Sequence, residues 1–226
     1  MFYDLHIHSC LSPCADDDMT PANIAGMARL KGLGMISLTD HNTGGNLAAM
    51  DKAAREAGLE FVPGVEVTSR EEVHILIYFA ALSEALRFTD DLYDSLPNIA
   101  NRSDIFGRQL LIDQNDEPMG ELHKLLLQAS PYSVEELCAM AHSAGGAAVP
   151  AHVNRDSFSV ISNLGFIPPG LFKYVEISPN LPQPRMEIAY GVLHSSDAHN
   201  LGSISEAENM LPGVRSARDL VALLRA

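Results

Sequence analysis

The stretch Met1-Phe-Tyr-Asp-Leu-His-Ile-His8 is a short apolar run that ends in two histidines spaced two residues apart. On a β-strand, side chains two residues apart point to the same face. The imidazoles of His6 and His8 are therefore expected to converge on one point, which is typical of metal ligands at the end of a strand. Alone, such a pair is more often two histidines on a solvent-exposed face. Other residues of the chain are needed to distinguish this from a metal site.

Six further apolar, β-branched runs follow the first and alternate with helical patterns. The seven predicted strands cover residues 2–7, 35–39, 61–65, 74–79, 147–151, 174–177 and 192–195. Strands that alternate with helices in this way are typical of parallel α/β proteins. We therefore expect an α/β fold with a parallel sheet.

The helical patterns carry recognisable end signals. Thr20 suits the N-cap position of one helix, Pro21 its first turn and Gly32 its C-terminal end. Ser133 and Glu136 have the spacing of a capping box. The helices predicted from these signals and from apolar periodicity cover residues 21–31, 46–57, 133–144, 205–210 and 216–224.

Residues 83–132 interrupt the alternation of strands and helices. A helical pattern over 84–99 is followed by an apolar run at 109–112 and a turn-rich stretch to Pro118, which together indicate a small hairpin. We expect this segment to be an insertion between the fourth and fifth strands of a single domain that covers residues 1–226. It either overhangs the functional site or decorates the surface without contacting substrate, and the sequence leaves both open.

The composition is that of an ordinary globular protein, with 226 residues of which 46% are hydrophobic and 19% charged. No apolar run approaches the roughly 20 residues that span a bilayer, and the N-terminus lacks the basic start of a signal peptide. We therefore expect a cytoplasmic protein without membrane contact. The formal net charge is −14 and the 15 Lys and Arg residues form no basic stripe, which argues against long nucleic acid as a partner. The sequence does not indicate an oligomeric state.

The three cysteines, Cys10, Cys14 and Cys138, form an odd number without a CxxC pair. A disulfide framework is therefore not expected. Cys10 and Cys14 lie close to the first histidine pair and could serve as metal ligands, although small buried or loop thiols are the commoner outcome.

Acidic and imidazole side chains lie at the ends of most of the predicted strands. They are His6 and His8, Asp40 and His41, Glu66, His152, and Asp197 and His199, at the ends of the first, second, third, fifth and seventh strands. Because parallel barrels assemble their active sites at the carboxyl ends of several strands, we expect these side chains to form one polynuclear metal site. His74 is the exception to the pattern, because it begins the fourth predicted strand rather than ending it.

Several motifs together resemble those of the polymerase-and-histidinol-phosphatase (PHP) family. They are Asp4-Leu-His-Ile-His8, Thr39-Asp-His-Asn42, Gly64-Val-Glu66, His74, Pro150-Ala-His152 and Ser196-Asp-Ala-His199, and they run from residue 4 to residue 199. The resemblance implies a distorted seven-stranded (β/α)7 TIM-like barrel, the PHP fold, with an insertion between strands 4 and 5. It also implies two or three Zn, Fe or Mn ions and the hydrolysis of phosphoesters.

The resemblance further implies a set of metal ligands. One ion would be held by His6, His8, Glu66 and Asp197, a second by Glu66, His74 and His152, and a third by His41, His199 and one residue of the loop after His8. For that last ligand we expect Asp16, in the stretch Asp16-Asp-Asp-Met-Thr-Pro21. The loop is longer than in relatives of the family, so Asp17 and Asp18 remain alternatives.

The chemistry of these residue types supports the same interpretation. Neutral imidazoles and carboxylates suit borderline cations such as Zn, Fe and Mn. Two close cations lower the pKa of a bridging water from about 16 toward about 7, so a metal-bridging hydroxide would attack the phosphoryl group without a side-chain nucleophile. We expect Asp4 and Asp40 to accept hydrogen bonds from metal-bound imidazoles, and His199 or His41 to protonate the leaving oxygen.

A phosphorylated substrate also needs hydrogen-bond donors. Arg155 offers a forked donor that matches phosphate oxygens, and we expect it, with its neighbour Asn154, to contact substrate and to act in catalysis. A surface ion pair is the alternative role for Arg155. Glu176 and Asn180, near the end of the sixth predicted strand, are weaker candidates for hydrogen bonds to substrate or water.

We predict a metal-dependent phosphoesterase that acts on a small phosphomonoester, such as a nucleotide or a histidinol-phosphate-like metabolite. A 3′–5′ exonuclease or oligonucleotide phosphodiesterase is an alternative that fits the acidic surface poorly. An amidohydrolase-like C–N hydrolase would carry a carboxylated lysine at a strand end, and no lysine lies at a predicted strand end. A non-catalytic metal-binding regulatory module is the third alternative.

Overall fold

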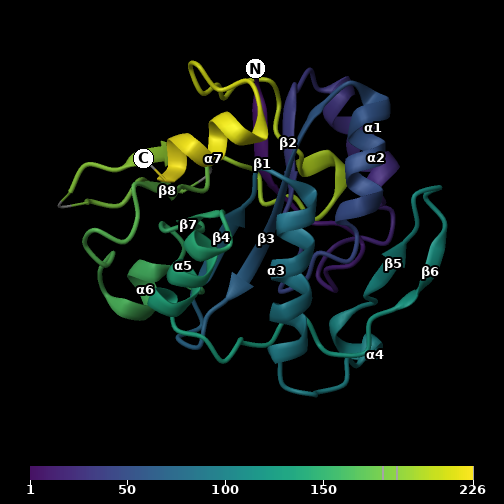
Figure 1. The fold of residues 1–226 in the computed structure, drawn as a ribbon, viewed down its shortest axis with the longest axis horizontal. Coiled ribbons are helices and arrows are strands. Elements are labelled where there is room, and N and C mark those ends of the chain that lie inside the picture. The colour runs from purple at the N-terminus through teal and green to yellow at the C-terminus, as the bar shows by residue number, and fades with distance from the viewer. Residues whose placement is uncertain (180, 187, 226) are drawn as a thin grey trace.

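The computed structural model describes residues 1–179, 181–186 and 188–225, and these form an α/β fold (Figure 1). All seven predicted strands are present. They are β1 (Tyr3–Ile7), β2 (Met35–Leu38), β3 (Glu60–Thr68), β4 (His74–Tyr78), β7 (Ala147–Pro150), β8 (Tyr174–Glu176) and β9 (Gly191–Leu193).

The seven strands form two sheets in the described part of the chain. The larger sheet has the order β1-β2-β3-β4-β7, and β8 pairs with β9 in parallel. An isolated parallel bridge between Ile7 and Ala198 ties the chain after β9 to β1. The amide of Val153 donates to the carbonyl of Glu176 at 2.9 Å, which ties the chain after β7 to β8. The larger sheet is thus curled, and both of its ends approach the β8–β9 pair.

The expectation of an all-parallel sheet is wrong for β4. β1, β2 and β3 are parallel to one another, whereas β4 is antiparallel to both of its neighbours, β3 and β7. Only residues 69–73 connect β3 to β4. A parallel connection needs a crossover of a dozen or more residues, so a link this short has to be a hairpin.

The reversed direction of β4 explains why His74 begins its strand. The register pairs His74 with Thr68, the last residue of β3, and Ile75 with Pro150, the last residue of β7. The first residue of this antiparallel strand therefore lies at the same rim as the carboxyl ends of its neighbours.

Five of the six predicted helices are confirmed, one of them in residues 83–132, and the structure adds a short one after β7. The helices around the sheets are α1 (Pro21–Leu30), α2 (Leu47–Ala57), α5 (Val134–Ser143), α6 (Val160–Leu164) and α7 (Ala217–Arg225). The Thr20 hydroxyl accepts the amide of Asn23, and Ser133 and Glu136 form the expected capping box. α1 and α2 lie together on one side of the molecule (Figure 1). Among the described residues, none of the helices is both long and apolar enough to cross a membrane.

The helix predicted over residues 205–210 is wrong, and only a 3-10 turn at Leu201–Ser203 precedes this segment. The amide of Tyr3 donates to the carbonyl of Asn209 at 3.1 Å, and Phe2 forms a bridge with Met210. These bonds hold the end of the segment beside the first strand, after a turn at 207–208, so tertiary pairing outweighs its local helical preference.

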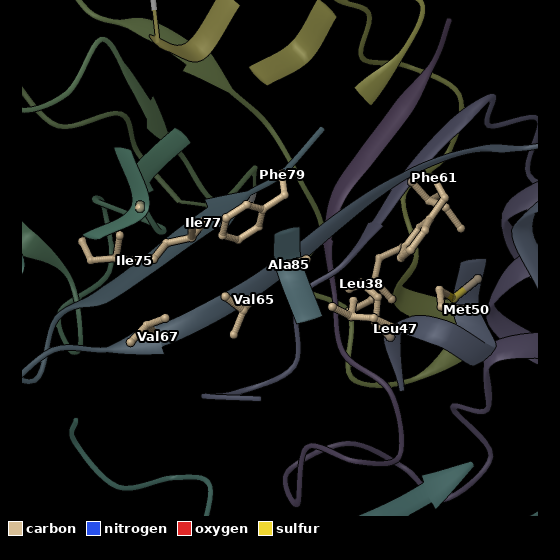
Figure 2. Close-up of a cluster of buried hydrophobic side chains, with 14 of the residues drawn as sticks. Leu38, Leu47, Met50, Phe61, Val65, Val67, Ile75, Ile77, Phe79 and Ala85 are labelled. Carbon is tan, nitrogen blue, oxygen red and sulfur yellow. The ribbon is translucent and has the colours of Figure 1, made fainter. Parts of the chain in front are cut away.

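The main hydrophobic core lies between the larger sheet and the helices. Figure 2 shows Val65 of β3 and Ile77 of β4 within it, on neighbouring strands. A second buried cluster joins the start of β1 to α7, and Leu5 packs there with Leu220 and Leu224.

Residues 83–132 contain the expected helix and hairpin. The elements are α3 (Leu82–Ser95), α4 (Ser103–Phe106), β5 (Leu110–Ile112) and β6 (Pro118–Glu121). α3 buries Ala85 and Phe88 in the main core, and it ends before Leu96 because a residue that precedes proline is disfavoured in a helix. β5 and β6 pair antiparallel at the edge of the molecule (Figure 1).

Candidate metal centre

Eight of the nine predicted metal ligands lie together at the rim where β1, β2, β3, β7 and β9 end and β4 begins. They are His6 in β1, His8 just after it, His41 after β2, Glu66 in β3, His74 in β4, His152 after β7, and Asp197 and His199 after β9. We call these eight side chains the rim cluster. Strands that end at one edge of a sheet bring side chains from distant parts of the sequence to one place.

Glu66 lies at the centre of the rim cluster and is 1% exposed. Its Oε1 lies 2.9 Å from His74 Nδ1, 3.2 Å from His152 Nε2 and 3.4 Å from His6 Nε2. Its Oε2 lies 3.1 Å from His41 Nδ1 and 3.3 Å from His8 Nε2. One buried carboxylate therefore contacts five imidazoles, an arrangement that suits a carboxylate shared between cations.

Three overlapping groups within the rim cluster place their ligand atoms within 4.8 Å of one another. The groups are His6, His8, Glu66 and Asp197; His41, Glu66 and His74; and His8, His41 and His199. The first is the group that the resemblance implies for one ion. In the second, His41 takes the place expected for His152, whose Nε2 contacts Glu66 from the side at 3.2 Å.

The loop after His8 does not bring a carboxylate into these groups in the described structure. The amide of Asp16 donates to the carbonyl of His199 at 2.9 Å, but the side chain of Asp16 is exposed. Asp17 pairs with Arg108 at 3.4 Å, and Asp18 is exposed. The backbone of the loop is therefore in position beside the cluster, whereas the ninth ligand stays a prediction.

Opposite charges within the cluster stabilise one another. Burial would raise the pKa of Glu66, but the surrounding imidazoles hold this pKa well below its usual range, and His74 has the largest lowering effect. Burial would lower the pKa of His8, but hydrogen bonds to Asp197 and Glu66 raise it to about 9. In the absence of a cation, a proton on His8 balances part of the carboxylate charge.

Three other imidazoles of the cluster are neutral at pH 7. Burial and the nearby His8 lower the pKa of His199 to about 4, and the same two causes lower the pKa of His41 well below its usual value. Burial also lowers the pKa of His152. The neutral imidazole is the form that binds a metal ion.

Glu176 holds His6 from the side opposite the cluster. Its Oε2 lies 2.9 Å from His6 Nδ1 and accepts the backbone amide of His152 at 3.0 Å. This contact leaves Nε2 of His6 directed toward Glu66 and Asp197. Glu176 was expected to contact substrate or water, and the structure places it against an imidazole instead. Its position at a strand end is the same signal that identified Glu66.

Asp40 supports His8 through a serine rather than directly. Nδ1 of His8 lies 3.0 Å from Ser12 Oγ, and the Ser12 hydroxyl donates to Asp40 Oδ1 at 2.7 Å. Sequence analysis missed Ser12, because a serine four residues after a histidine carries no distinguishing signal.

Asp4 bonds backbone amides, and its expected hydrogen bond to an imidazole is absent from the described contacts. It accepts the amide of Ser196 at 3.0 Å and that of Ser205 at 2.8 Å. Asp4 thereby anchors the loop that carries Asp197. It positions a candidate metal ligand and does not orient an imidazole.

Arg155 and Asn154 have different roles in the structure. Nη1 of Arg155 lies 2.6 Å from Asp197 Oδ2, and the Arg155 side chain is 38% exposed, so the guanidinium lies between the cluster and solvent. The Asn154 side chain bonds the backbone of Ser178, because its amide donates to the carbonyl of Ser178 at 3.0 Å and its oxygen accepts the Ser178 amide at 2.9 Å. Its contact with substrate stays a prediction. Asn180 lies outside the described residues.

The cysteines do not belong to the three ligand groups. Cys10 is buried and contacts the carbonyl of Leu110, whereas Cys14 is exposed. Burial raises the pKa of the Cys10 thiol to about 12, which disfavours the thiolate that binds metal ions.

The rim cluster fits divalent cations. His41 Nδ1 and His74 Nδ1 are buried against the Glu66 carboxylate at 3.1 and 2.9 Å, and Asp197 Oδ1 is buried against the imidazoles of His6 and His8, whereas His152 Nδ1 is buried without a hydrogen bond. Buried polar atoms in native proteins are almost always satisfied by a partner. Imidazole nitrogens and carboxylate oxygens that converge in this way are the donors that Zn, Fe and Mn prefer.

Two named proteins align with about a third of this chain. A 5′-3′ exoribonuclease of Haemophilus influenzae is 34% identical over 77 residues, which are 33% of this chain and 27% of that protein. A 3′,5′-nucleoside bisphosphate phosphatase of Chromobacterium violaceum is 38% identical over 76 residues, which are 32% of this chain and 26% of that protein. The alignments span about a quarter of the length of these relatives.

Two solved structures share the fold. A Bifidobacterium adolescentis protein, provisionally described as a metal-dependent phosphoesterase, superposes with a TM-score of 0.62 and 19% identity over 98% of this chain and 94% of that one. The lesion-specific endonuclease Q of Pyrococcus furiosus superposes with a TM-score of 0.59 and 22% identity over 88% of this chain and 48% of that one. At these identities the likeness concerns the fold alone.

The PHP domain model matches residues 4–162. This range includes six members of the rim cluster, from His6 to His152, and it confirms the resemblance found in the sequence motifs. The chain belongs to the PHP domain family.

Proposed function

We propose that this protein is a metal-dependent phosphoesterase that hydrolyses a small phosphomonoester. The observation that carries the proposal is the buried contact of Glu66 with five imidazoles. Buried charges are costly unless they are well paired or bind ions, so an assembly of this size indicates a cation site. Membership of the PHP family and the phosphatase and nuclease names of the relatives support a phosphoester as the bond that is broken.

Two or three Zn, Fe or Mn ions are the cofactors of this proposal. The rim cluster would hold them, with Glu66 shared between two of the positions, and Asp16 is our candidate for an additional ligand. Divalent cations held there supply an activated water near neutral pH and neutralise charge on phosphoryl oxygens.

Arg155 is our candidate for binding the phosphate, and its neighbour Asn154 is a candidate for a further contact with the substrate. The Arg155 guanidinium is partly exposed beside Asp197, and its fork matches two phosphoryl oxygens. An incoming phosphate would compete with the Asp197 carboxylate for this fork.

His199 is our candidate for moving a proton to the leaving oxygen. Its side chain is 28% exposed against 5% for His41, so it is the better placed of the two to meet the leaving group. Its Nδ1–H donates to the carbonyl of Asp197 at 2.8 Å, which orients the ring. Where only two of the three positions hold an ion and His199 is not a ligand, its Nε2 would be free to deliver a proton to the leaving oxygen.

For the scaffold we propose a distorted seven-stranded barrel in which β8 and β9 complete the enclosure begun by the larger sheet. The Ile7–Ala198 bridge supports this arrangement. Residues 83–132 are our candidate for an insertion that caps the site. Asn42, next to His41, donates from its amide to the carbonyls of Leu126 and Gln128, both at 2.8 Å.

A second candidate function is cleavage of short oligonucleotides from the 3′ end. The 5′-3′ exoribonuclease name of one relative favours a nucleic-acid substrate, although that name gives the opposite direction of cleavage. The net charge of −14 argues against long nucleic acid. A non-catalytic metal-binding module would hold ions but release no phosphate.

The test is a phosphate-release assay of metal-loaded protein on nucleotides, sugar phosphates, histidinol phosphate and short oligonucleotides. We expect release from at least one monoester, and loss of that release in Glu66→Gln. Cleavage of the oligonucleotides alone would favour the second function. No release from any compound at full metal occupancy would contradict both.

A further inference from the structure

Phe158 places an aromatic ring at the edge of the rim cluster. Its ring centroid lies 4.8 Å from that of His74, and the two rings are inclined by 23°. Phe158 is nevertheless 44% exposed. One part of the ring is thus held against a candidate metal ligand while the rest is open to solvent.

The backbone fixes this ring in place. Phe158 has φ of +54°, a region that a bulky L-residue rarely adopts. Its carbonyl accepts the amide of His74 at 2.9 Å, and the next residue, Ser159, is the N-cap of α6. The Ser159 hydroxyl also donates to the carbonyl of Arg155 at 2.8 Å. The ring therefore belongs to a tightly bonded loop.

Unusual backbone conformations of this kind gather at the rim. His152 and Asp197, both members of the rim cluster, also have positive φ, as does Asn42 beside His41. Such conformations persist where the surrounding structure enforces them, and they are frequent at ligand-binding sites. Phe158 shares this feature without being able to bind a metal ion.

We propose that Phe158 is a stacking platform for a nucleobase, so that the site selects phosphoesters that carry a base. This inference rests on the proposed phosphoesterase function and specifies its substrate class. The loop that follows β7 would supply two contacts, the guanidinium of Arg155 for the phosphate and the ring of Phe158 for the base. Every nucleobase has a face that stacks on an aromatic ring, so the platform favours bases as a class.

The base can belong to a mononucleotide or to the terminal nucleotide of a short oligonucleotide. A purely structural role is the competing explanation, because the ring also shields His74 from water. A shield would affect all substrates alike through metal occupancy, whereas a platform affects only those that carry a base.

The experiment compares a nucleoside monophosphate, ribose 5-phosphate and a dinucleotide on the metal-loaded full chain. The variants are Phe158→Leu, Phe158→Trp and the control Phe166→Leu, whose ring is 58% exposed just beyond the other end of α6. We expect Phe158→Leu to raise KM for the nucleotide about tenfold, the effect of losing one base–aromatic stack. KM for ribose 5-phosphate, kcat and metal content should stay unchanged. Phe158→Trp should retain the low KM, and the control should resemble the wild type.

The dinucleotide arm separates the two sources of the base. A KM effect on the dinucleotide alone assigns the platform to oligonucleotide ends, and an effect on the monophosphate assigns it to free nucleotides. Equal changes for nucleotide and ribose 5-phosphate, or a loss of metal in Phe158→Leu, would overturn the proposal in favour of a shield. Calorimetric binding of both monoesters is measured in parallel. If the wild type hydrolyses neither, the phosphoesterase function fails, while a binding preference for the nucleotide that Phe158→Leu removes still supports the platform.

Discussion

The two ends of β1 are equally buried but are stabilised differently. At its start, Tyr3 and Leu5 pack in an apolar cluster with Leu220. At its end, His6 and His8 are just as inaccessible but face carboxylates. The apolar end gains free energy from burial alone, whereas the rim keeps a buried imidazole nitrogen without a hydrogen bond. The difference agrees with our proposal that the rim holds cations.

The largest effect should come from Glu66→Gln at the rim. Loss of the shared carboxylate should lower phosphate release by on the order of a thousandfold or more, since metal ions contribute several kcal/mol to the transition state. Steady-state kinetics measures this effect. The control is Glu56→Gln, which removes an exposed carboxylate of α2 that pairs with Lys52 at 3.5 Å. Retention of activity in Glu66→Gln would show that the rim cluster does not take part in the reaction.

Leu5→Ala, at the apolar end, should lower stability without changing metal binding. The fully buried side chain of Leu5 leaves a cavity, and the free energy of unfolding should fall by about 2–5 kcal/mol. Denaturant unfolding measures the loss, and metal content per folded molecule should equal that of the wild type. A variant that loses its ions while keeping its stability would show that the two ends are not separable.

Glu176→Gln should have an intermediate effect confined to the rim. Because Glu176 orients His6, its neutralisation should weaken metal affinity about 10- to 100-fold. Competition with a chelator of known affinity measures the change. Glu121→Gln on exposed β6 is the matched control. Unchanged affinity in Glu176→Gln would make this contact a packing feature only.

The smallest effect, about tenfold for a change of one pH unit, is a graded dependence of metal affinity on pH. In the metal-free protein the raised pKa of His8, about 9, means that a proton occupies its ring below that pH. Metal binding must displace this proton, so apparent affinity should weaken as pH falls from 9 to 6, by about tenfold per pH unit for each proton displaced. Titration with a metal indicator at several pH values measures the slope. A flat profile would show that His8 is neutral before the metal binds.

Much of the rim was predictable from the sequence, because strand ends can be located from apolar runs and parallel strands bring their ends together. The ligands after β1, β2, β7 and β9 follow this rule. His74 is an exception to this rule because β4 is antiparallel to its neighbours. The third and fourth predicted strands leave only residues 66–73 between them, too few for a parallel crossover, so a hairpin that returns the chain to the same rim was the better prediction.

What escaped prediction depends on contacts between distant segments. Residues 205–210 look helical locally but pair with the first strand, and Asn154 looks free for substrate but bonds the backbone of Ser178. Ser12 and Phe158 carry no periodic or compositional signal. Their roles follow from the neighbours that the fold brings to them, His8 and His74.

Elemental analysis of the metal-saturated protein, beside Glu66→Gln, tests most directly whether the rim is a polynuclear cation site. The wild type should contain two or three divalent ions per chain, and Glu66→Gln at most one. Fewer than two ions in the saturated wild type, or the same content in both proteins, would contradict the account.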